Sequence, residues 1–299
     1  MRQPARGGTY VGLRTEVSER QRRFGEELRR LRDAAGVSAP EMGAMMGMKG
    51  PAVSHTEAGR LSINLDRLHI WLEACRVTDP DYRAALIAMS ESTGKGWWTS
   101  YRGLVRPTAI DLAEAEASAT ALDNYETFLI PGLLQTKAYS EVILEYAEKK
   151  VEFRRKRQQV LDLENGPPLR VVIHEAALRT NYGGPRVMRN QLNHLVEVGH
   201  LPHVTLQVLP FDCTVYADTD TPFMLVAGQH PRLDTVLLEH PHGSFFMGDP
   251  EGVAVFRRKF EQLRSLALPP LDAANPAPSP AFRDSSGLIQ HIRYTIQGR

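Results

Sequence analysis

The apolar residues near the start of the chain recur with the spacing of a helix that buries one face. Phe24, Leu28 and Leu31 stand four and three residues apart, so they lie on one side of a helix. Ser18 with Gln21 three residues later has the pattern of a capping box, which predicts that this helix begins after Ser18. The segment is therefore expected to be an amphipathic helix that packs against other helices.

Two short helices joined by a tight turn are predicted next. Ser38 with Glu41 is a second capping box, and Gly47 interrupts the apolar pattern that follows. Gly50 and Pro51 are expected at the N-cap and first position of the following helix, where a missing N–H costs little. The expected buried residues are Met42, Met45 and Met46 in the first helix, and Ala52, Val53 and Thr56 in the second.

Residues 38–60 have the spacing of a helix-turn-helix. The first helix is capped and apolar inside, the turn contains a small residue, and the second helix begins with small or polar residues that fit the major groove. Lys49 and Arg60 are expected to bind phosphates, and Ser54 and His55 to reach phosphates or base edges. The predicted DNA-binding residues are Lys49, Gly50, Pro51, Ser54, His55 and Arg60.

The end of this segment resembles the phage-repressor-like (XRE-type) helix-turn-helix family. Residues 53–60 (VSHTEAGR) match the ending "xVSxxExGR" of that family, and the resemblance covers about residues 20–90. It implies a buried pair between Arg32 and Glu57. Two departures stand out: Gly43 follows Met42 where Leu-Ala is usual, which predicts a softer helix, and Pro51 replaces a polar residue and removes one donor.

Beyond residue 107 the apolar period changes from helical to β-rich. Such runs occur at 169–174, 204–209, 223–227, 235–239 and 244–247, with a short strand within 121–135 and helices between them. The predicted fold class is α+β, with an N-terminal all-α helix-turn-helix bundle followed by a mixed α/β regulatory domain. The expected boundaries are a flexible basic arm at 1–17, the helix-turn-helix domain at 18–92, a linker at 93–107, the α/β domain at 108–268, a Pro/Ala-rich linker at 269–285 and a C-terminal segment at 286–299.

Residues 124–139 (NYETFLIPGLLQTKAY) resemble a signature of the C-terminal domain found on many actinobacterial helix-turn-helix regulators. Further matching strings extend the resemblance over about residues 108–268. That family was long filed as a domain of unknown function, is now described as toxin–antitoxin-like, and includes WhiJ-like regulators. The resemblance implies a transcription factor whose partner is a small neighbour-encoded protein.

Composition and charge narrow the classes of protein. The 299 residues are 42% hydrophobic and 24% charged, as in ordinary globular proteins, and no apolar run approaches the ~18 residues of a membrane span. Cys75 and Cys213 form no CxxC pair, which disfavours a disulfide framework and a cysteine zinc site. The polar, Arg-rich start is unlike a secretory signal. We therefore expect a cytoplasmic, nucleoid-associated protein without a membrane contact.

Positive charge is concentrated at the N-terminal end. Residues 1–76 hold 13 Lys/Arg against 9 Asp/Glu, whereas residues 77–299 hold 23 against 26. This asymmetry indicates a polyanion partner for the N-terminal part. The arginines of the first 30 residues either contact the DNA backbone or minor groove or form a solvated basic face, and the second interpretation is favoured.

Candidate catalytic and metal-binding groups in the α/β domain have weak patterns. His240 and His242 with Asp249, and likewise His200 with His203, lack the spacing of a metal site. The neighbours His174 and Glu175 have the types of an acid/base pair, but Glu175 is better placed as a helix cap. Phosphate and dinucleotide loops are absent from the sequence. We expect no enzyme activity, no metal and no cofactor.

The basic run 149–157 (KKVEFRRKR) is interpreted as a solvated helix face, with a docking site for an acidic partner as the alternative. Leu129 to Leu134 are similarly assigned to the core, with a pocket wall as the alternative.

The preferred function is a sequence-specific DNA-binding transcriptional regulator with a sensing or protein-interaction domain, acting as a homodimer on an inverted repeat of double-stranded DNA. The alternative is an antitoxin-like protein that neutralises a small neighbour-encoded protein and binds DNA only for autoregulation.

Overall fold

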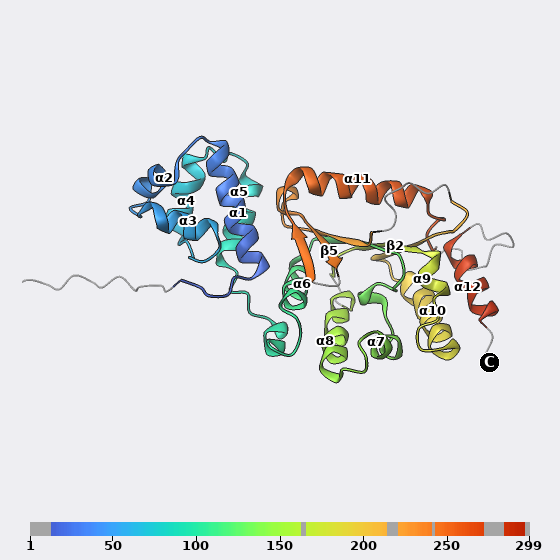
Figure 1. Ribbon diagram of the computed structural model, residues 1–299. Coiled ribbons are helices and arrows are strands. Elements are labelled where there is room, and N and C mark those ends of the chain that lie inside the picture. The colour runs from blue at the N-terminus through green and yellow to red at the C-terminus, as the bar shows by residue number, and fades with distance from the viewer. Residues whose placement is uncertain (1–12, 163–165, 214–220, 241–242, 272–283, 297–299) are drawn as a thin grey trace, which may run out of the picture. The chain divides into compact units, whose positions relative to one another are not determined.

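The chain forms two compact units, Met1–Lys95 and Gly96–Arg299. The computed structural model describes residues 13–162, 166–213, 221–240, 243–271 and 284–296 (Figure 1). Most of the expected basic arm and Pro/Ala-rich linker therefore lies outside the described residues, as does His242. The first unit is helical and the second combines helices with a mixed sheet, which confirms the predicted α+β fold class.

Five helices make up the described part of the first unit. They are α1 (Glu19–Ala34), α2 (Ala39–Met45), α3 (Gly50–Glu57), α4 (Leu65–Ala74) and α5 (Pro80–Glu91). Both predicted capping boxes are present, at Ser18 and at Ser38. The expected start of α3 is wrong by one residue. Lys49 has the extended backbone of an N-cap, with φ −81° and ψ 149°, so Gly50 and Pro51 are the first two helical residues.

Side chains from all five helices contribute to the core of the first unit. Leu28, Met42, Leu68 and Trp71 are each fully buried, and the Trp71 indole Nε1 donates to the backbone carbonyl of Leu28 at 3.1 Å. Met45 is 52% exposed, so its predicted place in the core is wrong. It is the last residue of α2, and the inward face of that helix passes through Met42 and ends on Met46, four residues on.

The second unit is built on a six-stranded sheet. Its strands are β1 (Ala121–Glu126), β2 (Leu169–His174), β3 (Val204–Leu209), β4 (Phe223–Ala227), β5 (Thr235–His240) and β6 (Gly243–Met247). The strand order is β3-β2-β1-β4-β5-β6. The pairs β3–β2 and β2–β1 are parallel, while β1–β4, β4–β5 and β5–β6 are antiparallel. Each β-rich run predicted from the sequence forms one of these strands.

Helices cover both faces of this sheet (Figure 1). Alternate residues of a strand point to opposite faces, so Val171 and Ile173 join the larger core, which includes α10 and α12, whereas Val172 joins the core under α11. The helices are α6 (Pro107–Ser118), α7 (Lys137–Ile143), α8 (Glu148–Gln158), α9 (Glu175–Arg179), α10 (Pro185–Gly199), α11 (Pro250–Leu266) and α12 (Ser285–Thr295).

Residues 97–101, within the expected linker, form the 3-10 helix η1 (Trp97–Tyr101). Trp98 and Tyr101 are buried in a small cluster with Phe153 of α8, and the ring centroids of Tyr101 and Phe153 are 5.3 Å apart. Both tryptophans of this 3-10 helix therefore pack within the second unit. Across the described ranges, no helix is both long and apolar enough to cross a membrane.

Candidate functional site

The turn between α2 and α3 is tight because Gly43 has no side chain. The Met48 N–H donates to the carbonyl of Gly43 at 2.7 Å, and a Cβ on Gly43 would lie 2.7 Å from the Met48 carbonyl oxygen. Gly47 has a φ of +63°, which favours glycine. The unusual glycine at position 43 is therefore a requirement of this close turn, rather than only a weakening of the helix.

Helix α3 presents one polar edge to solvent and buries the other side. Lys49, Pro51, Ser54 and Arg60 are exposed, and His55 is partly buried. The buried residues of α3 are Val53, Thr56 and Glu57. All six residues predicted to bind DNA, Gly50 included, thus lie on or beside the accessible edge of α3, which is free of covering chain from the described part of its unit.

The end of α3 is fixed to α1 in two ways. Arg32 donates to both carboxylate oxygens of Glu57, from Nε at 2.5 Å and from Nη2 at 3.1 Å, and both residues are 9% exposed. This confirms the implied pair. On the same helix, a Cβ on Gly25 would lie 2.3 Å from the Glu57 carbonyl oxygen, so α1 and α3 approach more closely than any other residue at position 25 allows.

The arginines of α1 do not form a free basic face. Arg23 is buried and pairs with Glu27 at 2.9 Å, and Arg30 pairs with the same carboxylate. Arg22 pairs with Glu19 at 2.6 Å. The predicted solvated basic face is therefore wrong for the buried Arg23, while Arg22 and Arg30 are partly exposed and pair with carboxylates three or four positions away on the same helix.

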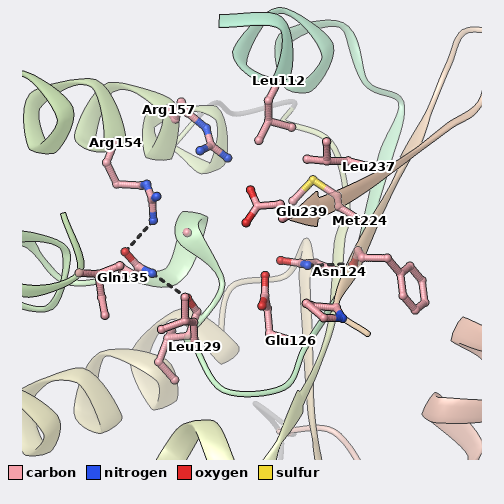
Figure 2. A pocket seen from close by; sticks show the side chains of 15 residues that line it. Leu112, Asn124, Glu126, Leu129, Gln135, Arg154, Arg157, Met224, Leu237 and Glu239 are labelled. Carbon is pink, nitrogen blue, oxygen red and sulfur yellow. Dashed lines mark hydrogen bonds between the residues drawn. The ribbon is translucent and has the colours of Figure 1, made fainter. Parts of the chain in front are cut away.

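A second candidate site lies in the other unit, at the carboxyl end of β1. Asn124 and Glu126 point from β1 to the larger core face of the sheet, and Glu239 points there from the end of β5 (Figure 2). The register pairs the end of β1 with the start of β4, and the start of β4 with the end of β5, which brings these residues together. Helix α8 supplies Arg154 and Arg157 to the same cavity.

The two arginines of this pocket differ in their partners. Arg157 is bound by Glu116 of α6 through two hydrogen bonds, of 2.8 and 2.5 Å. Arg154 donates instead to the neutral amide oxygen of Gln135 at 2.7 Å. Burial and the charge of Arg157 lower the pKa of Arg154 to about 10, which still leaves its guanidinium charged at neutral pH.

Two carboxylates enter the pocket from strand ends. Burial raises the pKa of Glu126 to about 8, and the charge of Glu239 adds to this shift. Asn124, which hydrogen-bonds to Glu126 and lowers its pKa, is itself held by a bond from Nδ2 to the Phe223 carbonyl at 3.1 Å. At neutral pH the pocket therefore combines a charged arginine with a proton-carrying carboxyl group.

The predicted solvated face of the basic run is wrong for its inward side. Arg154 and Arg157 turn into the pocket, whereas Arg155 is exposed. The missed signal is their spacing, because both arginines continue the helical stripe that starts at Val151. Every second residue of a strand lies on the same face of the sheet. Glu126 therefore lies on the same face as the core residue Leu122, which is a similar signal. Ile130, Leu133 and Leu134 are core, as favoured, while Leu129 lines the pocket and Ile130 lines it as well.

Three of the other candidate catalytic and metal-binding residues, His174, Glu175 and His203, form hydrogen bonds with the backbone. The His174 side chain accepts from the Ala176 N–H at 3.2 Å and caps α9, and Glu175 accepts from the Phe211 N–H at 2.9 Å. His203 Nε2 lies 3.0 Å from the Leu161 carbonyl. Within the described ranges, no group of three or more histidine, cysteine or acidic residues is placed to hold a metal ion.

Glu126 should make the stability of the second unit depend on pH. Because its pKa is raised from 4.5 to about 8, the folded state keeps a proton that the unfolded state loses between these values. The free energy of unfolding therefore falls as pH rises through this range. Calorimetry at about pH 5.5 and about pH 8.5 should give a lower transition for this unit at the higher pH, and Glu126→Gln should reduce the difference. A difference of equal size in the variant would contradict this assignment.

Together, the fold and the exposed edge of α3 define a DNA-binding regulator of the helix-turn-helix class. A family model described as Helix-turn-helix domain matches residues 23–86, which span α3. The chain belongs to the family described as Domain of unknown function (DUF5753), whose model matches residues 109–275 and so covers the sheet and the pocket. No curated protein matches the sequence.

Proposed function

We propose that the protein is a sequence-specific transcriptional regulator that acts as a homodimer on an inverted repeat. The observation that carries this proposal is the polar, uncovered edge of α3, which is supported from behind by a buried core and by the Arg32–Glu57 pair. An edge of this kind fits the major groove, and a dimer places two such edges about 34 Å apart on successive turns. Lys49 and Arg60 bind phosphates in this proposal.

The proposal predicts two kinds of mutant. Lys49→Ala and Arg60→Ala should weaken binding to all DNA sequences and lower the salt slope by about one unit each, because each removes one phosphate contact. Ser54→Ala and His55→Ala should change the preference between sequences. Fluorescence anisotropy with genomic fragments, repeated over a range of salt concentrations, measures both effects.

Arg29→Ala is the matched control, since this arginine is exposed on α1 with 67% of its side chain accessible. It should leave DNA binding unchanged. Loss of affinity without altered preference in all four mutants would contradict the assigned roles. A purified protein that shifts no genomic fragment at low ionic strength would refute the regulatory function itself.

The second unit acts in this proposal as the input domain, without a catalytic role. A small protein partner is one candidate input, as for an antitoxin-like protein. Its supporting observation is the exposure of Phe128, Phe211 and Phe245, at 63%, 56% and 56%, since exposed aromatic side chains are enriched in protein interfaces. Co-purification of a small protein at fixed stoichiometry from the native cell distinguishes this input from a small molecule.

A further inference from the structure

The pocket of the second unit lies at the carboxyl end of β1. From β1 the chain continues to β2 on one side, and the later strand β4 is added on the other side. The carboxyl end of β1 is therefore flanked by the carboxyl end of the parallel strand β2 and by the start of the antiparallel strand β4. Glu126, the last residue of β1, lines the pocket at this point.

Arg154 supplies this crevice with a positive charge that has no ionic partner. Its one direct hydrogen bond goes to the neutral amide of Gln135, and no carboxylate among the described residues is within ion-pair distance of it. A Cβ on Gly132 would lie 2.8 Å from Arg154 Nη1, so the missing side chain at position 132 makes room for the guanidinium. The arginine is thus held in place for an anionic group.

Two carboxyl groups face this arginine: Glu239, and Glu126, which carries a proton at neutral pH while the pocket is empty. They enter the cavity from the ends of β1 and β5 and point toward the same space (Figure 2). Neither carboxyl group forms an ion pair with a described residue, and the charge of Glu239 raises the pKa of Glu126. A cationic group bound between them would relieve this repulsion, which makes this side of the pocket suited to an ammonium group.

The walls and the size of the pocket favour a small organic molecule over a bare ion. The cavity measures about 60 Å³ and shares Arg154, Arg157 and Glu239 with an adjoining cavity of about 390 Å³. The larger of the two cavities lies in the range of small-molecule sites. The apolar part of the inner wall is formed by Leu112, Leu129, Ile130, Met224 and Leu237.

We propose that this pocket binds a free α-amino acid with an apolar side chain. Its carboxylate binds Arg154, its ammonium group lies between Glu126 and Glu239, and its side chain contacts the leucine-rich wall. The inference rests on the proposed regulatory function in one respect, because the amino acid would then be the effector that the input domain senses.

Calorimetric titration of the full chain with three matched probes tests this assignment. L-Leucine carries both charged groups, 4-methylpentanoate lacks the ammonium group, and 3-methylbutylamine lacks the carboxylate. Leucine should bind, and each analogue should bind about tenfold more weakly or worse, because each loses a charge-assisted contact. Valine, methionine and phenylalanine extend the panel to other apolar side chains.

Variants then assign the charges. Arg154→Met should weaken leucine binding about tenfold or more and abolish the advantage of leucine over 3-methylbutylamine. Glu239→Gln should weaken leucine binding to a similar extent and abolish the advantage of leucine over 4-methylpentanoate. Arg155→Met is the matched control, since Arg155 is exposed on the same helix and does not line the pocket, and it should bind leucine as the parent does.

Two results would overturn the assignment. One is the absence of binding by all four amino acids up to about 10 mM. The other is binding that Arg154→Met leaves unchanged in a variant with the parent's circular dichroism. DNA binding measured on the same preparation separates the two proposals: DNA binding without leucine binding refutes the pocket assignment alone, and leucine binding without DNA binding refutes the regulatory function alone.

Discussion

Replacing Arg32 with alanine is expected to destabilise the first unit by about 3–5 kcal/mol. The substitution leaves the carboxylate of Glu57 buried without its cation and also removes the hydrogen bond from Arg32 Nη1 to the Val37 carbonyl, of 2.8 Å. A small domain has about 5–15 kcal/mol of total stability, so this loss is a large fraction of it. Hydrogen exchange of α1 and α3, measured by mass spectrometry on the full chain, reports the change.

Arg29→Ala is the control for the loss of a positive charge on α1. Arg29 pairs with Asp33 at 3.5 Å in a largely exposed position, so its removal should cost no more than about 1 kcal/mol. The double variant Arg32→Met with Glu57→Leu should recover much of the stability, because it removes both buried charges together. Equal acceleration of exchange in Arg29→Ala and Arg32→Ala would show that burial of the pair does not matter.

The position of this pair connects stability to recognition. Glu57 is the last residue of α3, and its backbone also touches Gly25 of α1, so the inner side of α3 is fixed at its end. The polar edge with Ser54 is consequently presented by a helix whose rotation is restricted. A variant that loosens the pair should lose DNA affinity even though neither charge is accessible to DNA.

Local signals in the sequence predicted the elements well, because their causes are local. A capping box satisfies two N–H groups within four residues, so Ser18 and Ser38 could be assigned without knowledge of the rest of the chain. The strands could be predicted equally well from the sequence. Runs such as 169–174 and 204–209 are rich in apolar residues because these strands are buried on both faces of the sheet.

The pocket was not predicted, because its residues come from distant parts of the chain. Arg157 and its partner Glu116 are 41 residues apart, so the sequence around Arg157 shows only a basic run. Glu239 joins Glu126 through the pairing of β1, β4 and β5, and this strand order does not follow from the sequence pattern. Family resemblance predicted the Arg32–Glu57 pair, whereas no motif marked these pocket charges.

The two units use buried charge in different ways. In the first unit Arg23, Arg32, Glu27 and Glu57 all have partners of opposite sign, and their role is to fix helices to one another. In the second unit, one arginine of α8 is bound in this manner and the other is not. Arg157, the bound arginine, therefore fixes α8, which lines the pocket, to α6. Loss of this pair should lower the stability of the second unit.

Glu116→Ala is expected to destabilise the second unit by about 3–5 kcal/mol. Burial lowers the pKa of Arg157, but the charge and hydrogen bonds of Glu116 outweigh this effect and raise the pKa above its usual value. Without Glu116 this charge is buried and unpaired, and α8 loses its two hydrogen bonds to α6. Thermal unfolding should show the lower transition, and hydrogen exchange should quicken in α6 and α8.

Arg157→Lys is the informative companion, because lysine keeps the charge but cannot form both bonds of the guanidinium. It should be less destabilising than Glu116→Ala and still quicken exchange in α8. Arg155→Ala, on the exposed side of the same helix, is the matched control and should change neither measurement. If Arg155→Ala and Glu116→Ala lowered the transition equally, the loss would not depend on the buried pair, and that pair would not be what holds α8 against α6.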